Sequence, residues 1–417
     1  MKINSNTYVL CTLLISASLF VIFLVPALAM PFDDCNVDKI IHDIWLCLMF
    51  VSLGHTIVLA FVYLFLHNNN VTETIVHENP EDPLAMVSGM PRNFSFNDLK
   101  LATANFSKKL GRGGFGSVFE GNLGNVTKIA VKQLDQANQG TNEFLAEVKT
   151  IGSLHHVNLV RLIGFCAEDS HRLLVYEYMC NGSLDKWIFH RNQESPLDWP
   201  TRRKIILHIA QGLSYLHREC RRTIIHLDIK PQNILLDANF NARVADFGLA
   251  RFIETDQSHV STVLKGTPGY WAPEWWLKKK ITEKADVYSF GVVVLEIMCG
   301  RKNVDHSLTE EEDSLLYLVK TKAEEGQLFD VVDKQSDDVL QHKDEAVRII
   351  KTAISCLQID SADRPSMSTV VYILEGLMDI ETISDYSFLT WTPMEPPRGV
   401  DASDFTPLLP EILSGPR

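Results

Sequence analysis

The feature that most constrains this chain is a glycine-rich run followed, after a short gap, by an apolar strand that ends in lysine. Residues 110–118 read Leu-Gly-Arg-Gly-Gly-Phe-Gly-Ser-Val, a G-x-G-x-x-G-x-V pattern. Glycine lets the backbone approach a phosphate closely, so that amide N–H groups can donate to its oxygens. A dinucleotide-binding fold shows a similar pattern but continues into a helix, whereas here Gly121 gives a turn signal soon after Val118. The run therefore predicts a phosphate-binding hairpin.

A lysine and a glutamate downstream of the glycine run are expected to complete the phosphate site. Residues 129–132 read Ile-Ala-Val-Lys, which predicts a strand ending at Lys132. Residues 142–153 have the apolar spacing of a helix, and this helix carries Glu147. We expect Lys132 to contact the α- and β-phosphates of a nucleotide and Glu147 to pair with Lys132. A lone lysine or glutamate is usually a solvated charge, so this assignment rests on order and spacing.

The second half of the chain carries candidate proton-transfer and metal-binding residues. Asp228 and Asn233 stand in a D-x-x-x-x-N pattern with Lys230 between them, and Asp246 opens an Asp-Phe-Gly motif. We expect Asp228 to accept the proton of an acceptor hydroxyl and Lys230 to neutralise charge on the transferring phosphoryl group. Asn233 and Asp246 are predicted to bind Mg²⁺, which takes carboxylate and phosphate oxygens rather than a full protein cage.

Taken in order, these motifs resemble those of the protein kinase superfamily over residues 104–379. The resemblance implies an α+β fold of two lobes, with a small β-rich N-lobe and a larger helical C-lobe. It also implies that Glu274 of the Ala-Pro-Glu motif pairs with Arg364, and that Asp286 holds the backbone of the catalytic loop. The expected enzyme is a non-specific serine/threonine protein kinase.

Shorter sequences resemble plant receptor-like Ser/Thr kinases, and in particular the S-domain (G-type lectin) receptor-like group. They are Asn105-Phe106-Ser107, Leu-Val-Tyr-Glu-Tyr-Met at residues 174–179, His-Leu-Asp-Ile-Lys-Pro at residues 226–231 and Gly-Thr-Pro-Gly-Tyr at residues 266–270. We expect no lectin ectodomain in this sequence, so ligand binding does not carry over from that group.

The resemblance implies ATP and Mg²⁺ as cofactors and a hinge at residues 172–179. Tyr176 would lie at the rear of the nucleotide pocket, and backbone groups of Glu177 and Met179 would bind the edges of adenine. The residues expected to bind the nucleotide are Leu110, Gly111, Arg112, Gly113, Gly114, Phe115, Gly116, Ser117, Val118, Ala130, Lys132, Tyr176, Glu177 and Met179.

Two residues indicate the acceptor. Lys230, two residues past Asp228, resembles the Ser/Thr-specific pattern, and Thr267 in the segment that would contact the acceptor indicates the same choice. Some plant receptor-like kinases also phosphorylate tyrosine, so tyrosine stays open as a further acceptor.

Leu227 departs from the family pattern. The family usually has an arginine there, which pairs with an activation-loop phosphate and orders that loop. Leucine cannot form such a pair. Activity is therefore expected to depend only weakly on phosphorylation at Ser258, Ser261 or Thr262.

Two apolar stretches precede the kinase-like region. Residues 8–30 and 45–66 are each long enough for a membrane helix, which needs about 20 residues. The first stretch could instead be a signal peptide, because Ala27-Leu28-Ala29 fits a cleavage site. The predicted organisation is a signal peptide or first transmembrane helix at 1–30, an extracellular segment at 31–44, a transmembrane helix at 45–66, a cytosolic juxtamembrane linker at 67–103, the kinase domain at 104–379 and a flexible tail at 380–417.

Composition narrows the classes of partner. The net charge of −13 argues against a broad nucleic-acid-binding surface. The eight cysteines form no metal or disulfide framework. The expected partners are ATP, protein substrates and a receptor or co-receptor in the membrane. The expected location is the plasma membrane with the kinase domain in the cytosol, and the expected role is receptor-type signalling with an association to plant immunity.

An alternative function is that of a membrane-tethered pseudokinase or decoy that only binds other proteins. Four intact residues weigh against it, because a pure scaffold has no need of all four: Lys132, Asp228, Asn233 and Asp246.

Overall fold

The computed structural model describes residues 91–390, except 114–115, 125–126, 135–137, 190–195, 254–258, 260–265, 278–279, 305–313 and 382, together with Leu46 and Gly54. The chain divides into two units, residues 1–87 and 88–417, and the fold below is that of the second. The expected signal, extracellular and transmembrane segments lie outside the described residues, apart from Leu46 and Gly54. Among the described residues, no helix is both long and apolar enough to cross a membrane.

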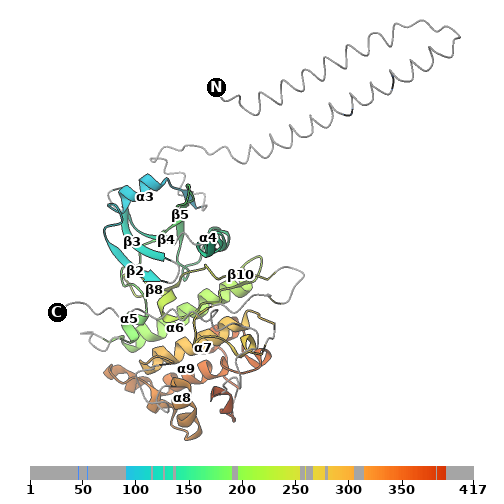
Figure 1. Cartoon of the computed structure of the whole chain (residues 1–417). Helices are drawn as coiled ribbons and strands as arrows, with labels where there is room; N and C mark the ends of the chain where they lie inside the picture. Colours follow the sequence, from blue (N-terminus) through green and yellow to red (C-terminus); the bar gives the residue numbers. More distant parts are fainter. Residues whose placement is uncertain are drawn as a thin grey trace, which may run out of the picture. The chain divides into compact units, whose positions relative to one another are not determined.

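A six-stranded sheet with the strand order β1-β5-β6-β4-β3-β2 forms the small lobe (Figure 1). Its elements are β1 (Arg92–Asn93), α3 (Phe96–Ala102), β2 (Lys109–Gly113), β3 (Gly116–Leu123), β4 (Thr127–Leu134), α4 (Asn138–Ile151), β5 (Leu162–Cys166) and β6 (Leu173–Glu177). Ile129 and Val131 alternate along β4 and are fully buried, in a core that they share with Leu173 and Val175 of β6. One face of the sheet thus packs inward, as a period of two residues requires.

The small lobe begins earlier than the boundary expected at residue 104. β1 pairs in parallel with β5, and the side chain of Ser95 caps α3 by accepting a hydrogen bond from the Asp98 N–H at 3.1 Å. Phe94 and Leu99 are buried in the same small core as β4. Residues 91–103, expected to belong to a juxtamembrane linker, are therefore folded onto the sheet.

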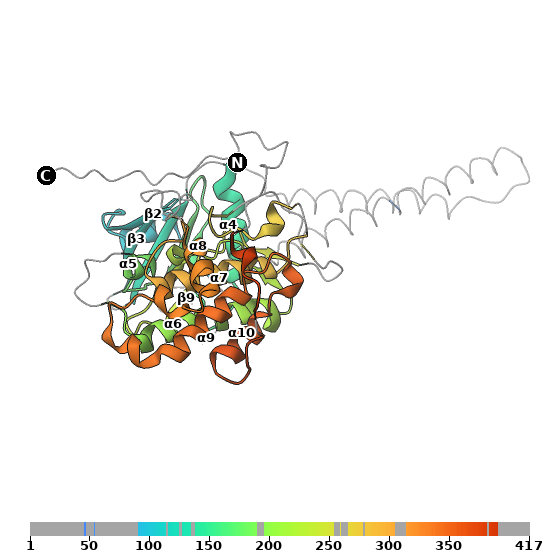
Figure 2. The same cartoon turned by 90° about the horizontal axis from the view of Figure 1, so that it is seen from below.

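Helices form the larger lobe, which lies below the sheet in Figure 1 and is seen from beneath in Figure 2. Its elements are α5 (Asp185–Ile188), α6 (Trp199–Ser214), η2 (Tyr215–Glu219), β7 (Ile224–Ile225), η3 (Pro231–Asn233), β8 (Ile234–Leu236), β9 (Ala242–Val244), β10 (Arg251–Phe252), η4 (Pro273–Trp275), α7 (Lys284–Cys299), α8 (Leu315–Glu324), η5 (Leu328–Val331), η6 (Asp337–His342), α9 (Lys343–Ser355), η7 (Ser361–Asp363), α10 (Met367–Leu374) and η8 (Ser387–Thr390).

Helix α7 is the centre of this lobe. Nearly every residue from Ala285 to Met298 is buried, as expected of a helix in the middle of a core. Two short sheets, β7 with β10 and β8 with β9, carry the loops that contain Asp228 and Asp246. The two lobes expected from the sequence are thus present.

The folded region also extends past the boundary expected at residue 379. Turn η8 lies against α8, where Leu389 is buried in the main core and Lys320 Nζ donates to Thr390 Oγ1 at 3.3 Å. Part of the segment expected to be a flexible tail is therefore packed on the large lobe.

Candidate active site

The glycine-rich run folds as a hairpin beside Lys132. β2 and β3 are antiparallel, and their pairing ends with Gly113 opposite Gly116; Gly114 and Phe115 lie outside the described residues. At Gly116, φ is +145° and a Cβ atom would lie 2.0 Å from the backbone oxygen of Gln133. Only glycine meets both conditions.

Strand register brings the other expected nucleotide-binding residues to the same sheet. Val118 of β3 pairs with Lys132 of β4, and Ala130 of β4 pairs with Tyr176 of β6. The residues of the hairpin differ in exposure: Gly111, Arg112 and Gly113 are exposed, whereas Leu110, Ser117 and Val118 are half-buried.

Lys132 lies between two carboxylates. Its Nζ is 3.2 Å from Glu147 Oε2 and 2.6 Å from Asp246 Oδ1. Burial lowers the pKa of Lys132, but attraction to Asp246 and Glu147 outweighs burial and raises the pKa above its usual value. The lysine is therefore cationic, and the contact with Glu147 expected from the sequence is present.

Glu147 is fully buried and accepts from two further donors. The hydroxyl of Tyr176 donates to Glu147 Oε1, and the Phe247 N–H donates to the same oxygen at 3.3 Å. Burial raises the pKa of Tyr176 well above its usual range, so the phenol keeps the proton that it donates. Glu147 thus ties helix α4 to the rear strand and to the Asp-Phe-Gly segment, and sequence reasoning did not foresee the Tyr176 bond.

Beyond Tyr176, the hinge side chains of Glu177 and Met179 have different surroundings. Glu177 Oε1 accepts from the Arg161 N–H at 2.7 Å and from Arg243 Nη1 at 2.6 Å. Met179 is buried, and its carbonyl accepts from the Gly182 N–H at 3.1 Å. The adenine contacts expected here involve backbone atoms of Glu177 and Met179. The Glu177 carboxylate is therefore not needed for them, and it instead pairs with Arg243 of β9.

The catalytic loop is held by a buried aspartate of α7. Asp286 accepts from the His226 N–H and from the Leu227 N–H, each at 2.8 Å, and from His217 Nε2 at 2.9 Å. These bonds fix Leu227 at φ +67°, a region that costs energy for a leucine. The role expected of Asp286 matches these contacts.

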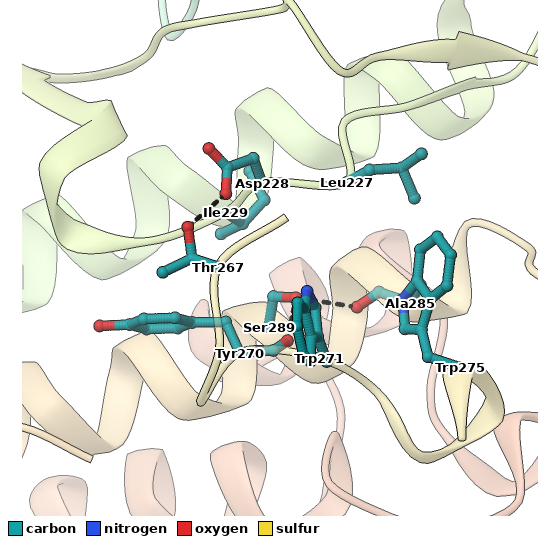
Figure 3. A pocket seen from close by; sticks show the side chains of 9 residues that line it. All are labelled: Leu227, Asp228, Ile229, Thr267, Tyr270, Trp271, Trp275, Ala285 and Ser289. Atoms are coloured by element: carbon teal, nitrogen blue, oxygen red, sulfur yellow. Dashed lines mark hydrogen bonds between the residues drawn. The ribbon is translucent and has the colours of Figure 1, made fainter. Parts of the chain in front are cut away.

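Asp228 is nearly fully buried and is contacted by three polar side chains, two from its own loop and one, Thr267, from a segment further along the chain. Thr267 Oγ1 donates to Oδ1 at 2.7 Å, a contact visible in Figure 3. Asn233 Nδ2 donates to Oδ2 at 2.8 Å, and Lys230 Nζ lies 2.9 Å from the same oxygen. Lys230 also donates to Thr267 Oγ1 at 2.7 Å. The two residues that indicate the acceptor thus touch the expected proton acceptor.

The residues expected to bind magnesium fit a hard cation. Asn233 Nδ2 donates to both the backbone oxygen and Oδ2 of Asp228. Because the amide nitrogen of Asn233 makes these bonds, its amide oxygen, Asn233 Oδ1, is the atom that would bind the metal. The side chain of Asp246 is 24% exposed, and the backbone of this residue adopts φ +68°. An amide oxygen and a carboxylate are ligands that Mg²⁺ accepts beside phosphate oxygens.

Leu227 lies in an apolar cluster below the catalytic loop, with Leu249, Ile281 and Ala285 among its members. A small cavity adjoins this cluster (Figure 3). It is lined by Leu227, Asp228, Ile229, Thr267, Tyr270, Trp271, Trp275, Ala285 and Ser289.

A buried ion pair anchors Glu274, at the end of the segment that follows Thr267. Arg364 donates from Nη1 to Glu274 Oε1 at 2.9 Å and from Nη2 to Oε2 at 2.6 Å. Both side chains are almost completely buried. The expected pair is therefore present, and the structure shows that it is bidentate, with two parallel N–H···O bonds.

Comparison with known proteins agrees with this geometry. Residues 104–373 match the family described as "Protein kinase domain". The chain is 50% identical over 327 residues to the G-type lectin S-receptor-like serine/threonine-protein kinase SD2-5 of Arabidopsis thaliana, covering 78% of this chain and 40% of that protein. A second Arabidopsis kinase of that description is 46% identical over 331 residues, covering 79% of this chain and 38% of the relative.

A rice relative shows the same pattern of coverage. LECRK2 of Oryza sativa subsp. japonica, also described as a G-type lectin S-receptor-like serine/threonine-protein kinase, is 39% identical over 349 residues, covering 82% of this chain and 43% of that protein. The chain thus spans about two fifths of the length of the relatives that it matches.

Proposed function

We propose, on the premise that the chain belongs to the protein kinase family, that it transfers the γ-phosphoryl group of ATP to serine and threonine hydroxyls of proteins. One observation carries the proposal: Asp228, Lys230 and Thr267 contact one another, while Lys132 bridges Glu147 and Asp246. The first group suits an acceptor hydroxyl and the second suits the phosphates of a nucleotide.

Each residue has a defined task in the transfer. Lys132 would contact the α- and β-phosphates, and Glu147 would hold its ammonium in place. Asp228 would take the proton from the acceptor hydroxyl as the hydroxyl oxygen bonds to phosphorus and the bond to the leaving ADP breaks. Lys230 would neutralise charge on the phosphoryl oxygens during this step. Magnesium held by Asp246 and Asn233 would supply positive charge to the phosphate oxygens.

The choice of serine and threonine rests on Thr267 and Lys230. Thr267 occupies Asp228 Oδ1, and Lys230 bridges Thr267 and Asp228 Oδ2. The relatives are described as serine/threonine-protein kinases, which supports the same acceptor.

We further propose that the chain is anchored in the plasma membrane. There it would take part in receptor-type signalling together with a receptor or co-receptor. Support comes from the apolar residues 8–30 and 45–66 and from the word receptor-like in the descriptions of the relatives. Alkaline extraction of membranes from cells that express the full chain tests the anchor. Retention of the chain in the pellet is expected, and its release into the supernatant contradicts this part.

Transfer of ³²P from γ-labelled ATP by the full chain in detergent micelles with Mg²⁺ tests the enzyme. The Asp246→Asn variant is the control, because it loses a charge at the metal and at Lys132. We expect transfer by the natural chain and a loss of at least about 100-fold in the variant. Equal signal from both would instead favour the binding module without catalysis.

A further inference from the structure

The turn at residues 266–270 contains Thr267, which contacts Asp228, and it is fastened from beneath by helix α7. Ser289 Oγ donates to the backbone oxygen of Tyr270 at 2.8 Å. The hydroxyl of Tyr270 lies 3.0 Å from both carboxylate oxygens of Glu296. Ser289 and Glu296 are seven residues apart and therefore lie on the same face of the helix. Two points of α7 thus hold the end of the turn.

Asn303, which follows α7, makes a second set of bonds to the same group. Its N–H donates to Glu296 Oε1 at 2.9 Å, and its side-chain Nδ2 donates to the backbone oxygen of Gly269 at 2.6 Å. Its own carbonyl accepts from the Leu315 N–H at 3.0 Å. Asn303 is 6% exposed and Glu296 is 1% exposed. One buried residue therefore links α7, the start of α8 and the turn.

The backbone of the turn connects Gly269 to Thr267. Gly269 adopts φ +90°, and a Cβ atom there would lie 3.7 Å from Asn303 Nδ2. The Tyr270 N–H donates back to the Thr267 oxygen at 3.2 Å. A shift of Gly269 would therefore move Thr267, whose hydroxyl lies on Asp228.

The nucleotide side of the site shares none of these bonds. Lys132 contacts Glu147 and Asp246, and Glu147 in turn contacts Tyr176 and the Phe247 N–H. Among the described residues, neither Asn303 nor Glu296 forms a hydrogen bond with this group. A change at Asn303 is therefore expected to act on the acceptor and to leave ATP binding unaffected.

We propose that Asn303 is a positioning residue for the protein acceptor: by holding the Gly269 carbonyl it fixes the 266–270 turn, along which an extended acceptor segment lies with its hydroxyl at Asp228. This inference rests on the proposed kinase function. Asn303 touches no reacting atom, so it acts through Thr267 and the turn.

The test compares the steady-state constants of Asn303→Ala with those of the natural full chain, using a serine-containing peptide selected from a degenerate library. The expected result is a rise of about fivefold in the KM for the peptide, as for loss of one buried hydrogen bond, with the KM for ATP within about twofold. Asn303→Asp keeps the size of the side chain and its backbone N–H but lacks the Nδ2 donor, so it should show the same split. Equal changes in both KM values would overturn the proposal.

Asn158→Ala is the matched control. Asn158 is 2% exposed and its Nδ2 donates to the Ala242 carbonyl at 3.2 Å, so the variant loses a bond of the same kind outside the turn. It should lower thermal stability without raising the peptide KM selectively. A selective rise in the control as large as that in Asn303→Ala would show general destabilisation and refute the positioning role.

Amide hydrogen exchange separates this inference from the proposed function, because it needs no turnover. Faster exchange at residues 266–270 in both Asn303 variants, without a change in α4, is expected. Unchanged exchange in the turn overturns the positioning role even if the chain is an active kinase. Faster exchange in a chain that phosphorylates nothing would leave the role of Asn303 in the turn intact and refute the kinase function alone.

Discussion

The Tyr176 hydroxyl donates to the same buried carboxylate, Glu147, that pairs with Lys132. The carboxylate therefore receives a donor from strand β6 as well as from Lys132. Because Glu147 is fully buried, each donor offsets part of the cost of removing its charge from water.

Tyr176→Phe removes one of these donors and keeps the ring. We expect kcat/KM for ATP to fall about fivefold, which corresponds to about 1 kcal/mol for one buried hydrogen bond. Steady-state kinetics on the full chain measures this. Tyr178→Phe makes the same change two residues further on, away from Glu147, and should leave kcat/KM within about twofold. An equal loss in both variants would contradict the role assigned to the Tyr176 hydroxyl.

The surroundings of Leu227 sharpen the expectation about the activation loop. Leu227 packs among Leu249, Ile281 and Ala285, so the position is apolar and offers a phosphate no partner. We expect the triple variant Ser258→Ala, Ser261→Ala, Thr262→Ala, whose sites lie outside the described residues, to keep its activity within about tenfold, or about 1.4 kcal/mol in barrier. A kinase assay beside the natural chain measures this, and a larger loss refutes the expectation.

Glu296 is expected to make stability depend on pH. Burial raises its pKa to about 8, against the opposing effects of the Asn303 N–H, the Tyr270 hydroxyl and Lys302, while Asp185 adds to the rise. The unfolded chain loses this proton near pH 4.3, so between there and pH 8 the folded state binds one proton more. The contribution of Glu296 to the free energy of unfolding is thus fully present below pH 4.3 and is lost as pH rises through 8.

Glu296→Gln removes this titration but keeps the shape of the side chain. Relative to the natural chain, its melting temperature should therefore rise as the pH is raised from 6 to 9, because only the natural chain then buries a charge. Thermal unfolding of both proteins in a pH series measures the difference between their melting temperatures. The effects of the other titrating groups are the same in both proteins and cancel in this difference. A difference independent of pH would mean that Glu296 is already ionised at pH 6.

Breaking the buried ion pair of Arg364 and Glu274 is expected to lower the stability of the fold more than breaking an ion pair at the surface. Arg364→Met leaves Glu274 buried without its partner and should cost about 3–5 kcal/mol, or a fall of at least about 6 °C in melting temperature. Lys322→Met removes an ion pair at the surface, because the side chains of Lys322 and Glu325 are 28% and 44% exposed. This change should shift the melting temperature by less than about 2 °C. Similar shifts in the two variants would contradict the ranking.

Much of the fold could be predicted because the motifs stand in a fixed order along the chain. Gly111, Gly113 and Gly116 permit the hairpin, and Lys132 follows on a strand of strong β-formers. The Lys132–Glu147 pair, expected from the order and spacing of the motifs, and the Glu274–Arg364 pair, implied by the resemblance to protein kinases, are both present. Glu274 and Arg364 lie 90 residues apart in sequence, so the order of the family's motifs, and no local spacing, pointed to that pair.

Other contacts could not be predicted because they join segments that only tertiary packing brings together. Asn303 carries no motif, and its bond to Gly269 depends on how the chain leaves α7. A weak signal existed for Glu296, an acidic residue within the apolar run from Val292 to Met298, since a buried charge there needs a partner. The buried Leu389 gave no clear signal, because the short apolar group around it (Tyr386, Phe388 and Trp391) has neither a helical nor a strand period.

The rate of phosphoryl transfer from ATP to a serine-containing peptide, measured for the natural full chain and for Asp228→Asn with ATP affinity measured in parallel, tests the central claim most directly. Asparagine cannot take the hydroxyl proton, so the rate should fall by about 100-fold to 10,000-fold while the Kd for ATP stays within about threefold, and the label in the natural reaction should be on serine. Equal rates in the two proteins, or no transfer by the natural chain, would contradict the account.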